Sequence, residues 1–320
     1  MTDPAAISVI IPSYNAVRFL PTTLRSVLAQ QGFVVEVLVV DDGSNDGTAE
    51  LLAAQFPQVR LIGQHNQGAA VARNTGLAQA SHEWVAFLDA DDVWLPGKLQ
   101  AQWALLAHHP EAQMCYTAWQ VWQTQDIEPA AAWLQAVIDA GAAPESDRQW
   151  HGASGWIYPE LLRDCVVWTS TVLARRSFLL QLGGFAPELR MGEDYDLWLR
   201  ASRLTPILRV PRPLALYRHH GHNITHRVPD RNHQAEVVGR ALTRWGYAGP
   251  DGRLADRKLV EAGLSRSWAD FAGANLAGSE PLLAWRSAWR SIIHWPWQRL
   301  AWMLVFKSGW RRIRHALAKA

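Results

Sequence analysis

Two aspartates separated by one residue, Asp89 and Asp91, follow an apolar run at residues 84–88 that reads as a buried strand. The carboxyl ends of strands are where open α/β sheets bind their ligands. Carboxylate oxygens suit Mg²⁺ or Mn²⁺, which commonly bind through one or two carboxylates together with phosphate oxygens. The pair therefore predicts a metal-bridged nucleotide diphosphate as the ligand. Acidic pairs also occur where they simply face solvent or cap a helix, so the rest of the chain has to decide.

Acidic residues also end the second strand-like run, residues 33–40. Asp41 and Asp42 follow it directly, and Gly43 leaves room for a nucleoside to approach the backbone. A carboxylate at this point can accept hydrogen bonds from a nucleobase N–H or from a ribose hydroxyl. The alternative is an Asp-rich turn that caps a helix over residues 48–56, and the two interpretations are compatible.

The loop after the first strand-like run, residues 7–11, reads Pro12-Ser13-Tyr14-Asn15. A short polar loop at a strand end can present its backbone groups to a uracil or a similar base. It can also be a plain strand-to-helix turn in which Asn15 is the N-cap. The residues of the loop alone leave both interpretations open.

A further anion-binding element is predicted where Gly68 opens a run at helical spacing, residues 68–80. The N-terminus of a helix attracts anions through its free N–H groups and its dipole. Arg73, about one turn into this helix, adds a positive charge. The alternative for Arg73 is a surface ion pair, which is the commoner fate of a lone arginine.

Glu193 and Asp194 begin another helical run, which continues to residue 203. Acidic residues at a helix N-terminus are favoured electrostatically whatever their function. They also offer a carboxylate base, which a reaction needs when a hydroxyl group attacks. His219 and His220 follow an extended segment, and a lone histidine is more often a surface or core residue than a ligand.

Strand-like and helical runs alternate along the first ninety residues, which predicts an α/β fold with a doubly wound, mostly parallel sheet. The predicted strands are 7–11, 33–40, 59–62 and 84–88, and the predicted helices are 15–30, 48–56 and 68–80. Further on we expect a helix at 130–140, a strand at 166–174, helices at 176–182 and 194–203, and an extended edge strand at 207–217. We place one domain at residues 1–228, with halves 1–115 and 116–228, and a helical region at 229–320.

Composition excludes several classes of protein. At 320 residues, with 49% hydrophobic and 19% charged residues, the chain can bury a substantial core and is not a disordered protein. Cys115 and Cys165 are its two cysteines, so no disulfide framework is expected and a reducing cytoplasm is the default. We read no signal peptide at the start and no apolar run of the roughly 18 to 20 residues that a spanning helix needs.

The last forty residues differ from the rest in charge. Residues 281–320 contain eight Lys or Arg, no Asp or Glu, and six of the eighteen tryptophans, whereas the other 280 residues hold 23 basic and 29 acidic side chains. Two helical pieces separated by Pro296 are expected here. Tryptophan beside Lys and Arg fits a helix that lies in the interface of an anionic membrane, although a helical subdomain packed on the core is the alternative. No recognised nucleic-acid module accompanies the basic residues.

The motifs, taken in order, resemble the family 2 inverting glycosyltransferases with the GT-A fold, from about residue 7 to residue 225. The resemblance thins at residues 119–165 and is weak after residue 230. The runs that carry it are Ser8-Val9-Ile10-Ile11-Pro12-Ser13-Tyr14-Asn15, Val39-Val40-Asp41-Asp42-Gly43-Ser44-Asn45-Asp46-Gly47-Thr48, Asn66-Gln67-Gly68, Ala72-Arg73-Asn74, Phe87-Leu88-Asp89-Ala90-Asp91-Asp92, Gly183-Gly184-Phe185, Glu193-Asp194-Tyr195-Asp196-Leu197-Trp198 and Tyr217-Arg218-His219-His220.

The resemblance implies roles for single residues. Asp91 ligates Mg²⁺ or Mn²⁺, Asp89 helps by contact with the metal or the sugar, and His220 lies near the metal or the diphosphate. Asp194 is the catalytic base, and Glu193 is its neighbour, in contact with the acceptor or the donor sugar. The nucleotide-sugar is bound by Pro12, Tyr14, Asn15, Asp42, Gly68, Arg73 and Asp89.

The function expected on this basis is transfer of a sugar from a nucleoside-diphosphate donor, UDP-type, to a hydroxyl of a saccharide or lipid-linked saccharide in cell-surface polysaccharide or glycan biosynthesis. The protein is expected in the cytoplasm, at the inner face of the membrane, with residues 281–320 in peripheral contact with it. A sugar-phosphate nucleotidylyltransferase is disfavoured because no Gly-rich, Arg-containing loop follows the first strand. A non-catalytic nucleotide-sugar or glycan-binding protein is the other alternative, although Asp89, Asp91 and Asp194 are all present.

Overall fold

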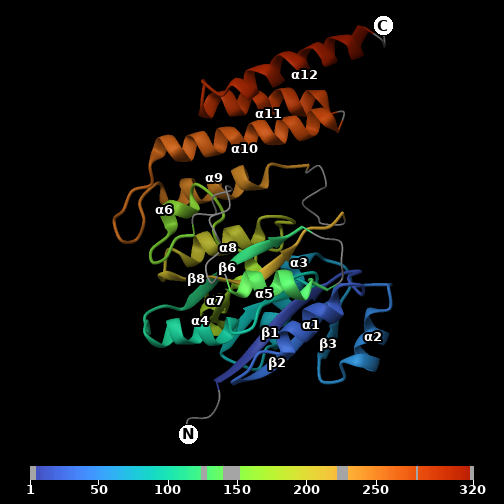
Figure 1. Ribbon diagram of the computed structural model, residues 1–320. Helices are drawn as coiled ribbons and strands as arrows, with labels where there is room; N and C mark the ends of the chain where they lie inside the picture. Colours follow the sequence, from blue (N-terminus) through green and yellow to red (C-terminus); the bar gives the residue numbers. More distant parts are fainter. Residues whose placement is uncertain (1–4, 124–127, 140–151, 222–229, 279, 318–320) are drawn as a thin grey trace. The chain divides into compact units, whose positions relative to one another are not determined.

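The computed structural model describes residues 5–123, 128–139, 152–221, 230–278 and 280–317, with side chains described as far as Arg311 (Figure 1). The chain forms two compact units. The first comprises Met1–Ile157 and Cys165–His220, and the second comprises Tyr158–Asp164 and Gly221–Ala320. Residues 140–151 lie outside the described parts.

The first unit is built on a sheet that has eight strands in the described part of the chain, in the order β3-β2-β1-β4-β7-β6-β8-β5. The half that comprises β3, β2, β1 and β4 is parallel throughout. The strands are β1 (Ala5–Ser13), β2 (Phe33–Asp41), β3 (Arg60–Gly63), β4 (Trp84–Phe87), β5 (Val93–Trp94), β6 (Met114–Trp122), β7 (Leu173–Arg175) and β8 (Ile207–Arg218).

The parallel half places the acidic strand ends at one edge of the sheet. β1 pairs with β2 from Ala5 opposite Phe33 to Ser13 opposite Asp41, and with β4 as far as Ile10 opposite Phe87. Because these strands point the same way, the segments that follow them leave from the same edge. The aspartates after β2 and those after β4 are therefore carried to one side of the molecule.

Helices cover the parallel half because their inner faces are apolar, as the sequence spacing predicts. Leu20, Leu24 and Val27 of the first helix are buried among residues from β1 and β2. Gly76 of the third helix lies so close to Ile10 that a Cβ atom there would be 2.4 Å from Ile10 Cγ2. The helices of this unit are α1 (Leu20–Leu28), α2 (Thr48–Gln55), α3 (Ala69–Gln79), α4 (Lys98–Ala107), α5 (Ala131–Asp139), α7 (Arg176–Gln181) and α8 (Glu193–Ala201).

The second half of the sheet differs from the sequence prediction. Of the strand expected at residues 166–174, only the end is strand: Thr169–Thr171 is a 3₁₀ turn, and β7 begins at Leu173 and runs antiparallel to β4. The β-branched residues that suggested a strand bury their side chains in a turn instead. The edge position expected for 207–217 is also wrong, because β5 pairs with Ala215 and Leu216 outside β8.

Prolines at positions 211 and 213 favoured the edge position, and the observed pairing of β8 gives Pro211 another explanation. The pairing of β8 with β6 shifts register where Thr117 faces Val210 and Ala118 faces Pro213, so Pro211 falls within a bulge. A bulge needs no ladder hydrogen bond from proline and tolerates it for that reason. The strand β6 itself was not predicted from the sequence.

The second unit is helical, as expected for the end of the chain. It comprises α6 (Tyr158–Leu161), α9 (His233–Trp245), α10 (Arg257–Ala277), α11 (Pro281–His294) and α12 (Arg299–Leu317). Small residues such as Ala269, Ala284 and Ala301 allow α10, α11 and α12 to pack closely around a core of their own. Among the described residues, no helix is long and apolar enough to cross a lipid bilayer.

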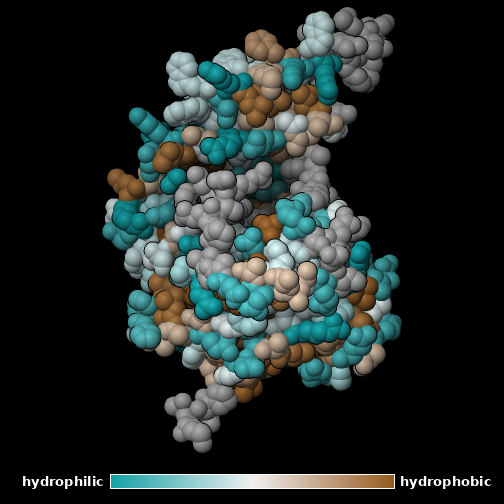
Figure 2. Space-filling view, in the orientation of Figure 1, coloured by the Kyte–Doolittle hydropathy of each residue, from teal (hydrophilic) through white to brown (hydrophobic). Residues whose placement is uncertain are grey.

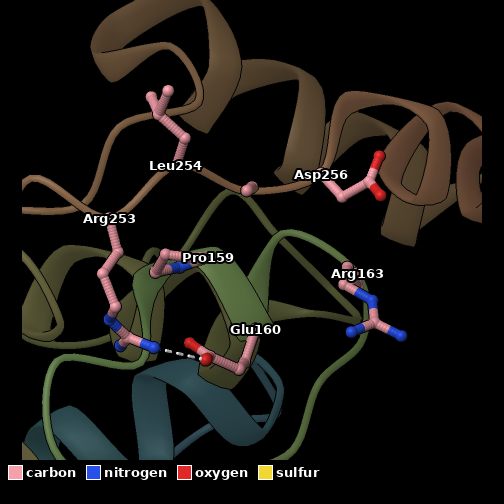
Figure 3. Close-up of a pocket in the computed structure, with 7 residues that line it drawn as sticks. Pro159, Glu160, Arg163, Arg253, Leu254 and Asp256 are labelled. Atoms are coloured by element: carbon pink, nitrogen blue, oxygen red, sulfur yellow. Dashed lines mark hydrogen bonds and ion pairs between the residues drawn. The ribbon is translucent and has the colours of Figure 1, made fainter.

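A pocket in the second unit lies between α6 and the segment that leads into α10 (Figure 3). The Glu160 carboxylate and the Arg253 guanidinium form an ion pair within it, with an N–O distance of 2.8 Å. Arg253 also pairs with Asp251, and Asp256 caps the first turn of α10. The charged groups of this pocket therefore largely satisfy one another.

Candidate functional site

Arg73 on α3 joins two acidic residues that lie far from it in the sequence. Its Nη2 atom lies 2.7 Å from Asp89 Oδ1, after β4, and its Nη1 atom lies 2.6 Å from Glu193 Oε1, at the start of α8. The guanidinium carbon also lies 5.4 Å from the centre of the Phe185 ring. Arg73 is buried, so its planar, permanently charged group fixes both carboxylates in a low-dielectric setting.

The electrostatics of this cluster depend on burial. Desolvation raises the pKa of Glu193 to about 7, together with the nearby Asp194, although Arg73 opposes the shift. Desolvation also raises the pKa of Asp89, again against the attraction of Arg73. The pKa of Arg73 is itself raised because Asp89 and Glu193 outweigh the cost of its burial. The single arginine therefore does not fully offset the negative charge around it.

Asp194 lies beside Glu193 in the first turn of α8. Its Oδ2 atom accepts a hydrogen bond from the Thr169 hydroxyl at 2.7 Å, and its Oδ1 atom accepts one from the Tyr195 backbone N–H at 2.7 Å. Unlike Glu193, Asp194 is only partly buried. These two hydrogen bonds fix the orientation of the Asp194 carboxylate.

Asp91 and His220 are brought together across 129 positions of sequence. The His220 Nε2 atom lies 3.0 Å from Asp91 Oδ2, and the His220 ring stacks on Phe19 at 4.5 Å between ring centres. The buried Arg218 donates from Nε to the Asp91 backbone oxygen at 2.8 Å. These two contacts hold the side chain and the backbone of Asp91, while its side chain stays partly exposed.

Asp92 is hydrogen-bonded to two residues, Ser170 and Arg218, that also contact Asp89 and Asp91. It is fully buried and accepts hydrogen bonds from the Ser170 hydroxyl at 2.6 Å and from the Arg218 N–H at 3.2 Å. The same Ser170 oxygen accepts from the Asp89 backbone N–H at 3.1 Å. Burial and the two adjacent aspartates raise the pKa of Asp92 well above its usual value. From the sequence, Asp92 could be a support for its neighbours or a helix cap for the segment at Pro96; its bonds to Ser170 and Arg218 agree with the first.

The acidic residues around Asp91 are suitable for a divalent cation. Five carboxyl groups, at positions 89, 91, 92, 193 and 194, surround only two arginines, Arg73 and Arg218. Among the described residues no group of three or more His, Cys, Asp or Glu side chains is arranged to hold a metal ion. This pattern fits Mg²⁺ or Mn²⁺ bound through one or two carboxylates and completed by phosphate oxygens, rather than a cage made by protein alone.

The loops after β1 and β2 are tied together. Asn15 has a left-handed backbone with φ of 50°, its N–H donates to the Ser44 hydroxyl at 2.8 Å, and its side chain accepts from the Asn45 N–H at 3.0 Å. Asp46 accepts from the Val17 N–H in the same region. The alternative that Asn15 caps the first helix is wrong, because α1 begins at Leu20 with Phe19 as its N-cap.

Other residues predicted to bind the nucleotide lie in these loops or next to them. Pro12 is near the end of β1, and Tyr14 is 55% exposed beside it. Asp42 is buried, and its oxygens accept hydrogen bonds from Gln64 Nε2 at 2.7 Å, from the Gln67 N–H at 2.9 Å and from the Gly68 N–H at 2.8 Å. Asp42 therefore holds the loop that precedes α3 in place.

The contacts divide the expected site residues into three groups. Arg73 links Asp89 to Glu193 and its neighbour Asp194, Asp91 pairs with His220, and Asp42 binds the loop at Gly68. The first two groups are joined through Asp92 and Ser170. Among the described residues, no hydrogen bond or ion pair joins Asp42 to Asp194. Thr169 and Ser170 were not predicted as site residues, because isolated hydroxyls carry no spacing signal. Arg218 was named within the run Tyr217-Arg218-His219-His220 but was given no role of its own.

Comparison with known proteins places these motifs in a family. Residues 8–139 match the family model described as "Glycosyl transferase family 2". A UDP-Glc:alpha-D-GlcNAc-diphosphoundecaprenol beta-1,3-glucosyltransferase, WfgD of Escherichia coli, is 31% identical over 62% of this chain and 70% of its own length. The putative teichuronic acid biosynthesis glycosyltransferase TuaG of Bacillus subtilis is 32% identical over 60% of this chain and 70% of its own.

Other relatives are longer, and solved structures agree on the fold. The chain spans about a third of the length of an uncharacterised glycosyltransferase of Rickettsia bellii, with 28% identity over 73% of this chain and 31% of that protein. The S. aureus TarS structure with UDP-GlcNAc has a TM-score of 0.54 and 19% identity, over 91% of this chain and 89% of that one. The mannosyltransferase PcManGT from Pyrobaculum calidifontis, in complex with GDP-Man and Mn²⁺, has a TM-score of 0.57 and 19% identity, over 98% and 88%. The chain belongs to the family 2 glycosyltransferases and has the GT-A fold.

Proposed function

We propose that the protein is an inverting, metal-dependent glycosyltransferase that moves a sugar from a nucleoside diphosphate to a hydroxyl group. The observation that carries the proposal is the Arg73 bridge, which brings Asp89 from the end of β4 to Glu193 and Asp194 at the start of α8. One buried arginine thereby holds the carboxylate assigned to the donor, Asp89, next to those assigned to the acceptor side, Glu193 and its neighbour Asp194. Such fixed geometry is what a single displacement at a sugar carbon requires.

Asp194 is the base in this reaction. Its carboxylate takes the proton from the acceptor hydroxyl while that oxygen attacks the anomeric carbon of the donor and the diphosphate leaves from the opposite face. Thr169 and the Tyr195 N–H hold the carboxylate in place. Glu193 stays on Arg73 and contacts the acceptor or the donor sugar.

Asp91, with Asp89 and His220, would hold Mg²⁺ or Mn²⁺ together with the diphosphate. When bound, such an ion supplies Lewis-acid stabilisation of the charge on the leaving group. The partly exposed Asp91 carboxylate presents oxygens to it, and Arg218 and His220 fix the backbone and side chain of Asp91. The structure of the mannosyltransferase PcManGT in complex with GDP-Man and Mn²⁺ supports this assignment.

The donor is proposed to be a UDP-sugar bound at the loops after β1 and β2, with Pro12, Tyr14, Asn15, Asp42 and Gly68. The acceptor is proposed to be a saccharide or a lipid-linked saccharide in cell-surface polysaccharide or glycan biosynthesis, at the cytoplasmic face of the membrane. The names of the bacterial relatives support both assignments, since one states a UDP-glucose donor and a diphosphoundecaprenol-linked acceptor, and another states teichuronic acid biosynthesis.

Two experiments test the proposal. A thermal-shift panel of nucleoside diphosphates and their sugars, with and without Mn²⁺, should show stabilisation by a uridine nucleotide that depends on the ion. Asp194→Asn should keep that stabilisation and lose transfer, whereas Asp230→Asn, at a carboxylate that is 88% exposed, should keep both. Full turnover by Asp194→Asn refutes the base assignment. A non-catalytic binding protein would give nucleotide stabilisation without transfer or donor hydrolysis in the parent chain.

A further inference from the structure

The last two helices of the second unit expose apolar side chains that a packed helix would bury. On α12, Ala301, Leu304 and Val305 face the core between α10, α11 and α12. The opposite face of α12 carries Met303, Phe306 and Trp310, with Phe306 72% and Trp310 64% exposed. Because these residues recur every three or four positions, they form one stripe along the helix.

The exposed stripe continues onto the neighbouring helix. On α11, Trp289 and Ile293 are exposed on the side away from the buried Ser287, Ser291 and Ile292. The rings of Trp289 and Trp302 meet at 5.6 Å between their centres, so the exposed faces of the two helices adjoin. Trp297, in the connection between them, is 82% exposed, and Ile293 is 77% exposed.

Basic side chains lie on the same surface. Arg286 on α11 and Arg299 and Lys307 on α12 are exposed, and none of the three forms an ion pair with any described residue. No acidic residue occurs between positions 281 and 320. Figure 2 shows apolar and strongly polar side chains intermixed over the part of the chain that Figure 1 labels α11 and α12. Arg312 and Arg314 belong to the same charge run, but their side chains lie outside the described ones.

We infer that this surface, made of Trp289, Ile293, Trp297, Met303, Phe306 and Trp310 with Arg286, Arg299 and Lys307, docks on an anionic phospholipid bilayer. Aromatic rings beside cationic side chains suit the boundary between headgroups and acyl chains, where the rings insert and the Lys and Arg side chains reach the phosphates. Each basic residue near an anionic leaflet adds to the attraction. The helices lie in the interface, because none of the described helices can span the membrane.

The charge pattern argues against a second copy of this chain as the occupant. A two-fold dimer through this surface would bring the same patch of each protomer together. Positive charges of the two protomers would then face one another, namely those of Arg286, Arg299 and Lys307. Residues 281–320 contain no acidic side chain that could offset them. Charged residues are also depleted from the cores of stable protein interfaces. An anionic bilayer offers acyl chains to the apolar side chains of this face and phosphate groups to its basic side chains.

The test is co-sedimentation of the full chain with vesicles of phosphatidylcholine mixed with phosphatidylglycerol, and with vesicles of phosphatidylcholine alone. The parent should pellet with the anionic vesicles and much less with the neutral ones. Phe306→Ser with Trp310→Ser should weaken the partition by about tenfold or more. Arg299→Gln with Lys307→Gln should weaken it on the order of 30-fold at low salt, and less at high salt.

Matched controls lie elsewhere in the same unit. Leu254→Ser removes another exposed apolar side chain, and Arg231→Gln with Lys258→Gln removes two exposed charges. These controls should pellet like the parent, and circular dichroism should show that every variant is folded. Equal pelleting of the parent and the aromatic variant overturns the inference. Light scattering that shows a parent dimer lost in the aromatic variant, without vesicle binding by the parent, overturns it in favour of self-association.

Discussion

The Thr169 hydroxyl donates a hydrogen bond of 2.7 Å to Asp194 Oδ2, across 25 positions of sequence. Thr169 lies in the buried 3₁₀ turn Thr169–Thr171. Two side chains from β5 and α4 hold this turn in place. Trp94 Nε1 donates to the Ser170 backbone oxygen at 2.7 Å, and Gln102 Nε2 donates to the Thr171 backbone oxygen at 2.9 Å. These two hydrogen bonds fix the position of the turn independently of Asp194. The turn therefore acts as a fixed support for that carboxylate.

Thr169→Val should lower kcat by about 10- to 100-fold with little change in the KM for the donor. A hydrogen bond to a charged group is worth about 1.5–3 kcal/mol, and valine has the shape of threonine without the hydroxyl. Steady-state transfer assays with a UDP-sugar donor measure both constants. Thr169→Ser keeps the hydroxyl and should restore most of the activity. If serine is as impaired as valine, the methyl group matters rather than the hydrogen bond.

Arg73→Gln should destabilise the folded protein by about 3–5 kcal/mol, because it leaves the buried carboxylate of Glu193 and the partly buried carboxylate of Asp89 without their positively charged partner. Chemical denaturation followed by circular dichroism measures the free energy of unfolding. Arg60→Gln is the matched control, because Arg60 and Glu36 form a more exposed ion pair at 3.6 Å, worth less than about 1 kcal/mol. Equal losses for the two variants would show that Arg73 is not a structural bridge.

The parallel half of the sheet could be predicted because three of its four strands are short apolar runs that are followed by Pro12, Asp41 and Asp89. The second half could not. The strand β6, Met114–Trp122, mixes Tyr, Thr, Trp and Gln without the alternation that marks a half-buried strand, and it has no clear turn signal after it. The antiparallel β7 is three residues long, and its pairing with β4 is a tertiary contact.

The acidic residues of the site could be named from their positions after strands and at a helix start. Their partners could not. Arg73 was equally compatible with a surface ion pair, and only the fold shows that it spans 120 positions to reach Glu193. Thr169 and Ser170 belong to a segment that the pattern predicted as a strand. Hydroxyl groups occur throughout any sequence, so no spacing distinguished these two.

Gly76→Ala should destabilise the protein by about 1–3 kcal/mol, even though alanine is the better helix former. The new methyl carbon would lie 2.4 Å from Ile10 Cγ2 and 3.3 Å from Val40 Cγ2, both on buried strands. Gly273→Ala on α10 meets nothing within 4 Å and should instead stabilise by up to about 1 kcal/mol. Thermal and denaturant unfolding measure both changes. Stabilisation by Gly76→Ala, like that expected for Gly273→Ala, would show that close packing of α3 on β1 does not require glycine.

Lys98 is a buried amine in the first turn of α4, with its Nζ atom 2.7 Å from Gln102 Oε1 and 3.9 Å from the centre of the Trp94 ring. Burial lowers its pKa to about 7, against a small opposing effect of Cys115. The unfolded chain, with a lysine pKa near 10.4, therefore binds more protons than the folded one between about pH 7 and pH 10. The free energy of unfolding should rise with pH across that window, by at most about 1.4 kcal/mol per pH unit for this group.

Lys98→Met should remove that dependence, because methionine has a similar unbranched shape and carries no proton. The stability of the variant relative to the parent should therefore be greatest near pH 7 and should decrease steadily as the pH rises toward 10. Urea unfolding at several pH values measures the difference. The Gln102 side chain loses its donor in the variant at every pH, so that cost shifts the whole curve without changing its slope. A difference in stability that does not vary with pH would mean that Lys98 titrates in the folded protein as it does in the unfolded chain.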